Sequence, residues 1–437
     1  MLMLSQRSSF PIWHLRSGSD RRFRSGHPWV YSNELRESPK GIKLGEVVEL
    51  RDAGGVFLAR GIGNPHSLIA FRALSRDSSV SQPLSVENVV GALVKALRLR
   101  TNLGFSSYSH RLCYGEVDGL PGLVIDRYVL CGRAGQVFVV QAHTAGMDVL
   151  MPEIEQILEQ FVRSNEIHNN WDRTGIVIRN DLGVRSLEGL ESQEPRILKE
   201  ISGVDLRQAM IEVRPVLGAE PLKFHVDLVE GQKTGFFLDQ FANIQIAALR
   251  FRDLVGAGSK KVVRILDLCC YAGQWGAQLA QVFRDQGVPI QVVLADASAK
   301  ALEQAKKNIG TGATIETLKI DVLKDLTALP SQSFDIVISD PPALIKSRKD
   351  IPTGKQAYVK LTTQALRLVK PEGGVVICSC SALLDEEMFS QILCKSSSKA
   401  GVTTQWIARG VQSPDHPILQ EFPEGKYLKC WVGVVRK

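Results

Sequence analysis

The chain has 437 residues, of which 44% are hydrophobic and 23% are charged, and its formal net charge is +7. This composition excludes a disordered or collagen-like chain, and the length predicts several domains, three by our interpretation. The sequence has no apolar run long enough to span a membrane, so we expect a cytoplasmic protein that does not bind membranes. The excess of basic residues favours a polyanionic partner.

The cysteines and the basic N-terminus each have a simple interpretation. Eight cysteines occur without disulfide-framework or zinc-site spacing, so we expect reduced thiols and no metal. Arginine is frequent in the first thirty residues, as in organelle transit peptides, an interpretation that we disfavour. Aromatic residues lie between the basic ones, which fits a patch that contacts RNA, although burial in a core explains each aromatic equally well. The residues are Arg7, Arg16, Arg21, Arg22, Arg24, Trp13, Phe23, Trp29 and Tyr31.

The apolar pattern first predicts two smaller domains. Between residues 30 and 74, short apolar runs alternate with turn residues, which predicts a small β-barrel within residues 1–80. Residues 81–212 begin with an amphipathic helix at 86–100 and include a strand at 137–141. We interpret this second part as a central α/β domain whose chemistry the residues do not reveal.

Residues 213–437 show the alternation of strands and helices that is typical of βαβ units. Such units form a largely parallel sheet covered by helices. The predicted fold class is therefore α/β, with a Rossmann-like domain at the C-terminus. The elements are expected at 262–268, 279–283, 291–295, 299–308, 334–339, 361–369 and 375–379.

A glycine-containing turn follows the first of these strands. Asp267 would lie at the strand end, and Gly273 would let the backbone approach a ligand closely. The next strand ends in Asp296, whose carboxylate can accept hydrogen bonds from both ribose hydroxyls. This pair indicates an adenosine-type ligand. A nicotinamide-dependent oxidoreductase is disfavoured because the G-x-G-x-x-G pattern is absent.

An acidic residue followed by two prolines ends a later strand. Asp340 and Pro341 would form a rigid polar rim, which class I methyltransferases use to hold a planar, nitrogen-containing substrate. We therefore predict S-adenosylmethionine as the cofactor. Asp321 would lie near the adenine amino group, although a helix N-cap explains this residue as well.

Methylation at carbon 5 of a pyrimidine requires activation of that carbon, because it is a poor nucleophile. The usual solution is transient attack by a thiolate on carbon 6. A strand at 375–379 would deliver Cys380 beside Asp340, so we expect Cys380 to be the nucleophile, an assignment that depends mainly on the resemblance described next. Asp340, protonated or sharing a proton, would hold the N3/N4 edge of the base. The cysteines interpreted as packing residues are Cys269, Cys270, Cys378 and Cys394.

Short motifs over nearly the full chain carry a resemblance to a known family. They are Gly26-His-Pro-Trp-Val-Tyr, Gly63-Asn-Pro-His-Ser, Asp118-Gly-Leu-Pro-Gly-Leu-Val-Ile-Asp-Arg, Gly231-Gln-Lys-Thr-Gly-Phe-Phe-Leu-Asp-Gln, Asp340-Pro-Pro, Cys378-Ser-Cys-Ser, Asp415-His-Pro and Phe422-Pro-Glu-Gly-Lys-Tyr-Leu-Lys. In them the chain resembles bacterial class I methyltransferases of the PUA-domain type, which form 5-methylcytosine in large-subunit ribosomal RNA.

The resemblance implies a PUA barrel that helps hold RNA and a catalytic domain that binds S-adenosylmethionine. It implies 23S ribosomal RNA as the substrate and a covalent adduct between Cys380 and carbon 6 of cytosine, with Asp340 as the second catalytic residue. A homodimer is left open. The residues that it places near the cofactor are Lys233, Thr234, Phe236, Phe237, Asp239 and the aromatic of the glycine turn, Tyr271.

Three departures from the family pattern lie near these motifs. Phe241 stands where we expect arginine, and Gln274-Trp275-Gly276 stands where Gly-Phe-Ser is usual. Ala382 and Leu383 replace a His-His pair, so a proton-handling histidine cannot be carried over. Two alternatives follow: methylation of another RNA base without a cysteine nucleophile, and an RNA-binding assembly factor that has lost activity.

Overall fold

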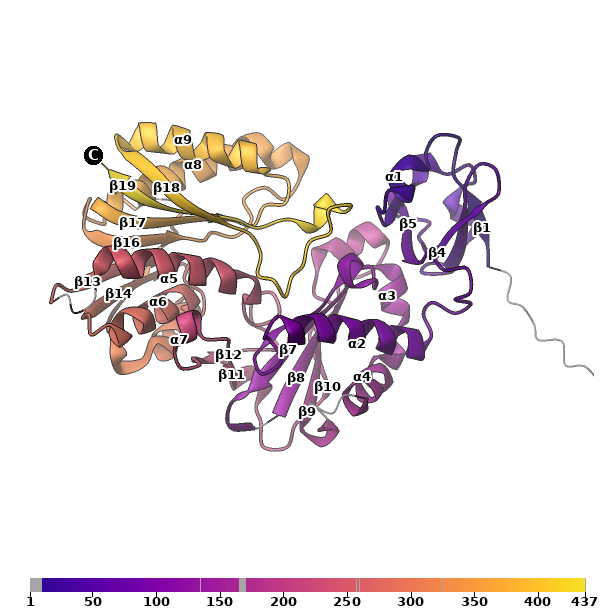
Figure 1. Ribbon diagram of the computed structural model, residues 1–437, viewed down its shortest axis with the longest axis horizontal. Coiled ribbons are helices and arrows are strands. Elements are labelled where there is room, and N and C mark those ends of the chain that lie inside the picture. The colour runs from indigo at the N-terminus through magenta and orange to yellow at the C-terminus, as the bar shows by residue number, and fades with distance from the viewer. Residues whose placement is uncertain are drawn as a thin grey trace, which may run out of the picture. The chain divides into compact units, whose positions relative to one another are not determined.

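The computed structural model describes residues 10–133, 135–164, 170–256, 258, 260–324 and 326–436. These residues form two compact units, each described by itself below (Figure 1). The first unit comprises Met1–Arg207, Leu228–Gly235 and Pro417–Gly425, and the second comprises Gln208–Asp227, Phe236–His416 and Lys426–Lys437. The domain boundaries at residues 80 and 212 stay predictions, and Arg7 of the basic N-terminal run lies outside the described residues.

The first unit begins with a small antiparallel-rich sheet. Its strands follow the order β1-β3-β4-β5-β2, and they enclose a core that includes Trp13, Phe23 and Phe71. Burial therefore accounts for two of the four aromatics of the predicted RNA patch. The strands are β1 (Ile12–His14), β2 (Trp29–Tyr31), β3 (Val47–Arg51), β4 (Phe57–Gly63) and β5 (Ile69–Ser75), and the short helix α1 spans Arg21–Arg24.

A second sheet of this unit carries the helices α2 (Val86–Asn102) and α4 (Ile154–Arg163). Strand β8 (Gly135–Ala142) pairs in parallel with β9 (Thr174–Ile178) and antiparallel with β7 (Leu123–Leu130). The two helices pack with the sheet in one apolar core. The flanking strands are β6 (His110–Tyr114), which pairs with β7, and β10 (Arg196–Lys199), which pairs with β9; a short helix α3 spans Ala145–Val149.

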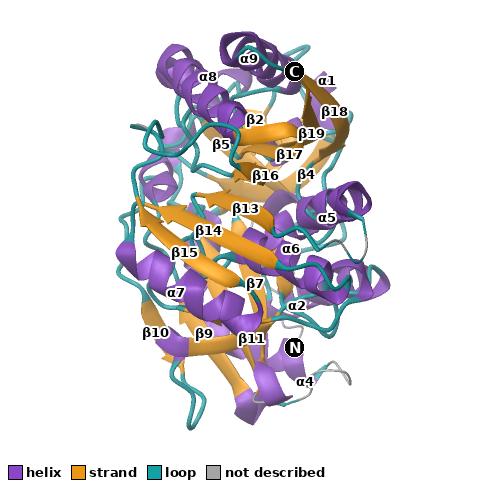
Figure 2. Ribbon diagram, turned by 90° about the vertical axis from the view of Figure 1, so that its left-hand side faces the viewer, coloured by secondary structure: helices purple, strands orange, loops and turns teal. Residues whose placement is uncertain are grey.

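The second unit contains the predicted largely parallel sheet, in the order β15-β14-β13-β16-β17-β19-β18 (Figure 2). From β15 to β17 neighbouring strands are parallel, whereas β19 is antiparallel to both neighbours. The strands are β13 (Val263–Leu268), β14 (Ile290–Asp296), β15 (Thr314–Lys319), β16 (Phe334–Ser339), β17 (Val369–Ser379), β18 (Thr403–Gly410) and β19 (Lys429–Arg436). An antiparallel pair joins β11 (Ala209–Glu212) to β12 (Lys223–Val226).

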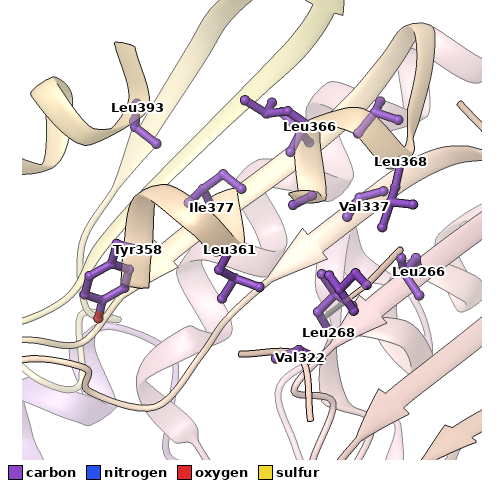
Figure 3. Close-up of a cluster of buried hydrophobic side chains, with 14 of the residues drawn as sticks. Leu266, Leu268, Val322, Val337, Tyr358, Leu361, Leu366, Leu368, Ile377 and Leu393 are labelled. Atoms are coloured by element: carbon purple, nitrogen blue, oxygen red, sulfur yellow. The ribbon is translucent and has the colours of Figure 1, made fainter. Parts of the chain in front are cut away.

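Alternate residues of these strands face two helical layers. Leu266 and Val337 belong to a core with the helices α8 (Ile351–Leu368) and α9 (Glu386–Ala400), as Figure 3 shows for its central side chains. The helices α5 (Phe241–Val255), α6 (Gln274–Asp285) and α7 (Ala299–Ile309) lie on the other side of the sheet (Figures 1 and 2). Burial on both faces explains why the strands are nearly continuous apolar runs. None of the described helices is long and apolar enough to cross a membrane.

Candidate active site

The predicted site residues of the second unit follow neighbouring parallel strands. In the register of the sheet, Leu268 pairs with Ala295 and with Ser339, and Ser339 pairs with Ile377. The carboxyl ends of β13, β14, β16 and β17 therefore meet at one edge, where open α/β sheets bind their ligands. Asp296 ends β14, Asp340 follows β16, and Cys380 follows β17. The sheet thus brings these three residues to the same edge, as predicted.

The turn after β13 has an unusual backbone. Cys269, Tyr271 and Gly273 all have positive φ angles, of 61°, 46° and 74°. A Cβ atom on Gly273 would lie 2.9 Å from the Cβ of Ala305, so glycine is required there. The backbone N–H of Tyr271 donates to Asp296 at 3.0 Å, which ties the turn to the end of β14. Strained backbone of this kind is typical of ligand-binding turns.

Asp267 is buried beneath this turn with only part of its hydrogen-bonding capacity used. Its Oδ2 accepts the backbone N–H of Gly276 at 3.0 Å, and its Oδ1 has no partner among the described residues. Burial, aided by the negative charges of Asp340 and Asp296, raises the pKa of Asp267 to about 8. An unsatisfied buried carboxylate oxygen is a natural acceptor for a cationic or N–H donor. S-adenosylmethionine carries such donors in its ammonium and adenine amino groups, so the residues present fit this cofactor.

The remaining acidic candidates differ in environment. Asp296 also accepts the N–H of Ser298 at 2.9 Å and lies half-buried before helix α7. Asp321 is half-buried, and its Oδ1 accepts the N–H of Leu323 in a local turn rather than at the start of a helix. A turn of this type explains Asp321 without a ligand. Its role beside the adenine stays a prediction.

The segment from Lys233 to Asp239 divides between the two units. Lys233 and Thr234 belong to the first unit, in which Thr234 is fully buried and donates to Asp126 at 2.5 Å. In the second unit, Phe237 packs edge-on against Tyr271, with ring centroids 5.4 Å apart.

The other two members of this segment have structural partners within the second unit. Phe236 packs against Phe224, with ring centroids 4.9 Å apart. Asp239 is buried and accepts a hydrogen bond from the Tyr427 hydroxyl. Phe237 is therefore the member of the segment seen against the glycine turn, and cofactor contacts of the others stay predictions.

Two side chains hold the carboxylate of Asp340. The indole N–H of Trp275 donates to its Oδ2 at 3.1 Å, and the amide of Gln240 donates to the same oxygen at 2.8 Å. The amide of Asn243 donates in turn to Gln240 at 2.7 Å. Trp275 is one of the departures from the family pattern, and a phenylalanine at this position would have no N–H to donate.

Phe241, another departure from the family pattern, contacts a cationic side chain. The guanidinium of Arg214 lies over the ring of Phe241 at 5.3 Å from its centroid. Phe241 stands at the start of α5, where the family pattern has arginine. Arg214 thus brings a cation from another segment to this position and gains a cation–π contact there.

Cys380 lies in a loop that buried hydroxyl groups hold in place. Its Sγ lies 3.9 Å from the carbonyl oxygen of Pro341, and the residue is partly accessible. The hydroxyl of Tyr358 contacts both Ser379 and Ser381, at 2.8 and 2.9 Å. Ser381 also accepts the N–H of Ile345 at 3.1 Å, which ties the loop to the segment after Asp-Pro-Pro.

The other cysteines of the second unit have different surroundings. Burial raises the pKa of Cys269, Cys270 and Cys378, so these thiols are held protonated, consistent with packing. Cys394 is exposed on α9, so the packing interpretation was wrong for this residue. The expectation followed from the general tendency of cysteine to be buried, whereas the buried face of α9 is formed by residues such as Phe389, Ile392 and Leu393. No cluster of three or more potential metal-ligating side chains occurs in the described part of the chain.

Lys429 is a residue to which the sequence analysis assigned no role. It opens β19 opposite Ser379 and is only 3% exposed. Its ammonium donates to the carbonyl oxygens of Ser381 at 2.6 Å and Tyr427 at 2.8 Å. Burial lowers the pKa of Lys429 to about 8, while the neighbouring Glu386 and Cys380 act in the opposite direction. A lysine at the head of an otherwise apolar strand is the signal that could have identified it.

Matches to known proteins agree with this geometry. The model of the PUA-like domain matches residues 14–76, and a methyltransferase domain model matches residues 259–424. A Streptococcus mutans protein assigned as an SAM-dependent methyltransferase has the same fold, with a TM-score of 0.72 at 16% identity, over 97% of this chain and all of that one. A methyltransferase structure solved with SAH matches at a TM-score of 0.73 and 16% identity, covering 97% of this chain and 99% of the other.

The fold and the strand-end site thus define a class I methyltransferase with S-adenosylmethionine as its cofactor, and the predicted fold class is confirmed. The ribosomal RNA large subunit methyltransferase I of Aliivibrio fischeri (strain ATCC 700601 / ES114) is 31% identical over 431 residues, which cover 95% of this chain and 97% of that protein. The enzyme of the same name from Klebsiella pneumoniae (strain 342) is 28% identical, over 97% and 98% of the two chains. The chain belongs to the family of ribosomal RNA large subunit methyltransferase I.

Replacing Lys429 should change the reactivity of Cys380. Because a buried ammonium stabilises a nearby thiolate, we expect Lys429→Met to slow alkylation of Cys380 by iodoacetamide about tenfold at pH 7. The charge of Lys429 is present below its pKa of about 8 and is lost above it, so the difference from the wild type should disappear above about pH 9. Peptide-resolved mass spectrometry measures the rate.

The exposed Cys394 is an internal control, since its alkylation should be equal in both proteins. Lys429→Arg keeps a positive charge at all these pH values and should restore the rate. Equal alkylation of Cys380 in wild type and Lys429→Met at pH 7 would show that Lys429 only supports the loop.

Proposed function

We propose that this chain methylates carbon 5 of a cytosine in large-subunit ribosomal RNA and that Cys380 is the nucleophile. The observation that carries the proposal is the juxtaposition of Cys380 with the Asp-Pro-Pro segment, with 3.9 Å between Sγ and the Pro341 carbonyl oxygen. A thiol at this place is needed for carbon methylation and serves no purpose in methylation of an exocyclic amine. The relatives named for methylation of large-subunit ribosomal RNA supply the substrate class.

The proposed reaction begins with addition of the Cys380 thiolate to carbon 6 of the base. The addition places electron density on carbon 5, which becomes the nucleophile. S-adenosylmethionine, when bound, would supply the methyl group that carbon 5 takes; the bond between that methyl group and the sulfonium sulfur breaks, and S-adenosylhomocysteine is the leaving group. Removal of the carbon 5 proton by a base then allows the carbon–sulfur bond to break, which releases the Cys380 thiolate and restores the aromatic ring.

Asp340 would orient the base in this reaction. Its Oδ2 is fixed by Trp275 and Gln240, so the carboxyl group has a defined orientation before the substrate arrives. A carboxyl group so oriented can hold the N3/N4 edge of cytosine through hydrogen bonds. The target base must leave its stack to reach such a pocket, which suits a loop or another unpaired segment of RNA.

The proposed nucleophile is tested by methyl transfer to deproteinised large-subunit RNA. We expect the wild type to form 5-methylcytidine and Cys380→Ala to form no detectable product, because the carbon cannot be activated without the thiol. Nucleoside mass spectrometry of the digested RNA identifies the product. Cys394→Ala, which removes an exposed thiol on α9, should keep full activity.

Each other outcome supports a different interpretation. Label on another base, or full activity of Cys380→Ala, would make Cys380 a packing residue and favour the alternative methyltransferase. RNA binding without binding of S-adenosylmethionine would favour the inactive assembly factor.

The indole of Trp275 should contribute to the rate. Trp275→Phe removes the indole N–H that donates to Asp340 and leaves the amide of Gln240, and a hydrogen bond to a carboxylate is worth about 1.5 to 3 kcal/mol, so kcat should fall at least about tenfold. The matched control is Trp431→Phe, because Trp431 also donates to a carboxylate, that of Glu386, at 3.2 Å. Equal kcat values for the two variants would refute a role of Trp275 in orienting Asp340.

A further inference from the structure

A basic groove lies between α8 and α9, which run side by side in the second unit (Figures 1 and 2). Its volume is about 760 Å³. Glutamine, threonine, valine and isoleucine side chains complete the lining, and no acidic residue contributes among those that the structure describes. The charged residues of the groove are Lys355, Lys360, Arg367, Lys395 and Lys399.

The positive charge of this groove is not neutralised by carboxylates within the described ranges. Lys360 donates to the carbonyl oxygens of Leu323 and Lys324, and Arg367 donates to the carbonyl oxygen of Lys399. These backbone partners fix two of the cations without cancelling their charge.

The N-terminal arginines are a useful contrast. Arg22 pairs with Glu34 at 2.9 Å, and Arg24 pairs with both Asp20 and Asp52. Two arginines of the run that looks most basic in the sequence are therefore compensated by carboxylates. The groove, whose members are scattered through the sequence, keeps its charge.

The course of the groove suits a nucleic-acid backbone. Lys355 and Arg367 are twelve residues apart on α8, which corresponds to about 18 Å along the helix axis and spans several phosphates of one strand. Glutamine and threonine side chains commonly bind phosphate and ribose oxygens. A protein partner fits less well, because protein interfaces are poor in lysine and rich in aromatic residues, and no aromatic side chain lines this groove in the described structure.

The groove begins near the catalytic edge of the sheet. Helix α8 follows the segment after Asp340, and α9 follows the segment after Cys380, so both helices start at the edge where the reaction is proposed to occur. Both then run back toward the opposite edge, because each connects two strands of the sheet that run in the same direction, β16 to β17 and β17 to β18. One RNA molecule can therefore contact the site and the groove together.

We propose that the groove between α8 and α9 binds the phosphate backbone of the substrate RNA outside the catalytic pocket. This inference rests on the proposed function only in taking RNA as the substrate. The groove would add affinity without reading sequence, since phosphate contacts position a nucleic acid and base contacts specify it.

The test compares two variants that each remove three positive charges. The groove variant carries Lys355→Gln, Lys395→Gln and Lys399→Gln, and the ammonium groups of these three lysines donate no hydrogen bond within the described structure. The control variant carries Lys260→Gln, Lys306→Gln and Lys307→Gln, which are exposed elsewhere on the same unit. Binding of deproteinised large-subunit RNA is measured across a range of salt concentrations.

We expect the groove variant to lower the slope of log affinity against log salt concentration by about 2 to 3, since each lost phosphate contact removes about 0.7 to 0.9. The KM for RNA should rise, and kcat at saturating RNA should stay the same. The control variant should reproduce the wild-type slope.

Equal slopes for the groove and control variants would overturn the proposal. It would also be overturned if the groove variant bound RNA as tightly as the wild type but no longer bound an acidic protein. The binding assay requires no methyl transfer, so its result is independent of whether the product is 5-methylcytidine.

Discussion

The register of the parallel strands is the constraint on which the site depends. Asp296, Asp340 and Cys380 are far apart in the chain and meet because β14, β16 and β17 end at the same edge of one sheet. A shift of one residue in any strand would move each side chain to the opposite face of the sheet, where it would meet a different helical layer, so close packing on both faces fixes the register strongly. The position of the reactive groups is in this sense a consequence of core packing.

Buried polar groups add the finer positioning. The hydroxyls of Tyr358, Ser379 and Ser381 form a closed network under the Cys380 loop, and Lys429 binds the loop from the neighbouring antiparallel strand. Such groups cost free energy to bury unless they are hydrogen-bonded, and fully satisfied networks hold a loop in one conformation. Asp267 differs, because one of its oxygens is left for a ligand to satisfy. Burial of polar groups therefore has two effects here: it holds the Cys380 loop in one conformation, and it leaves Asp267 with an oxygen that the cofactor can satisfy.

Two departures from the family pattern change which side chains contact the residues of the site. Trp275 supplies a donor to Asp340 that phenylalanine lacks, and Arg214 brings a guanidinium to the ring of Phe241. Both exchanges lie close to residues that the sequence predicted for the cofactor or the base. The chain thus keeps the acidic residues of the site while it changes the side chains that hold them.

The sequence by itself determined the α/β class, the Rossmann-like domain and the strand-end positions of Asp267, Asp296, Asp340 and Cys380. These follow from local patterns, since apolar runs and the residues that end them are adjacent in the chain. Only the tertiary structure revealed that Thr234 is buried against Asp126, that Lys429 lies beside the Cys380 loop and that Trp275 reaches Asp340. It also gathered lysines of two helices into one uncompensated groove while pairing two of the N-terminal arginines, Arg22 and Arg24, with carboxylates. The reason is physical: charge compensation and hydrogen-bond partnership depend on which distant segments pack together, and no local pattern encodes the partner.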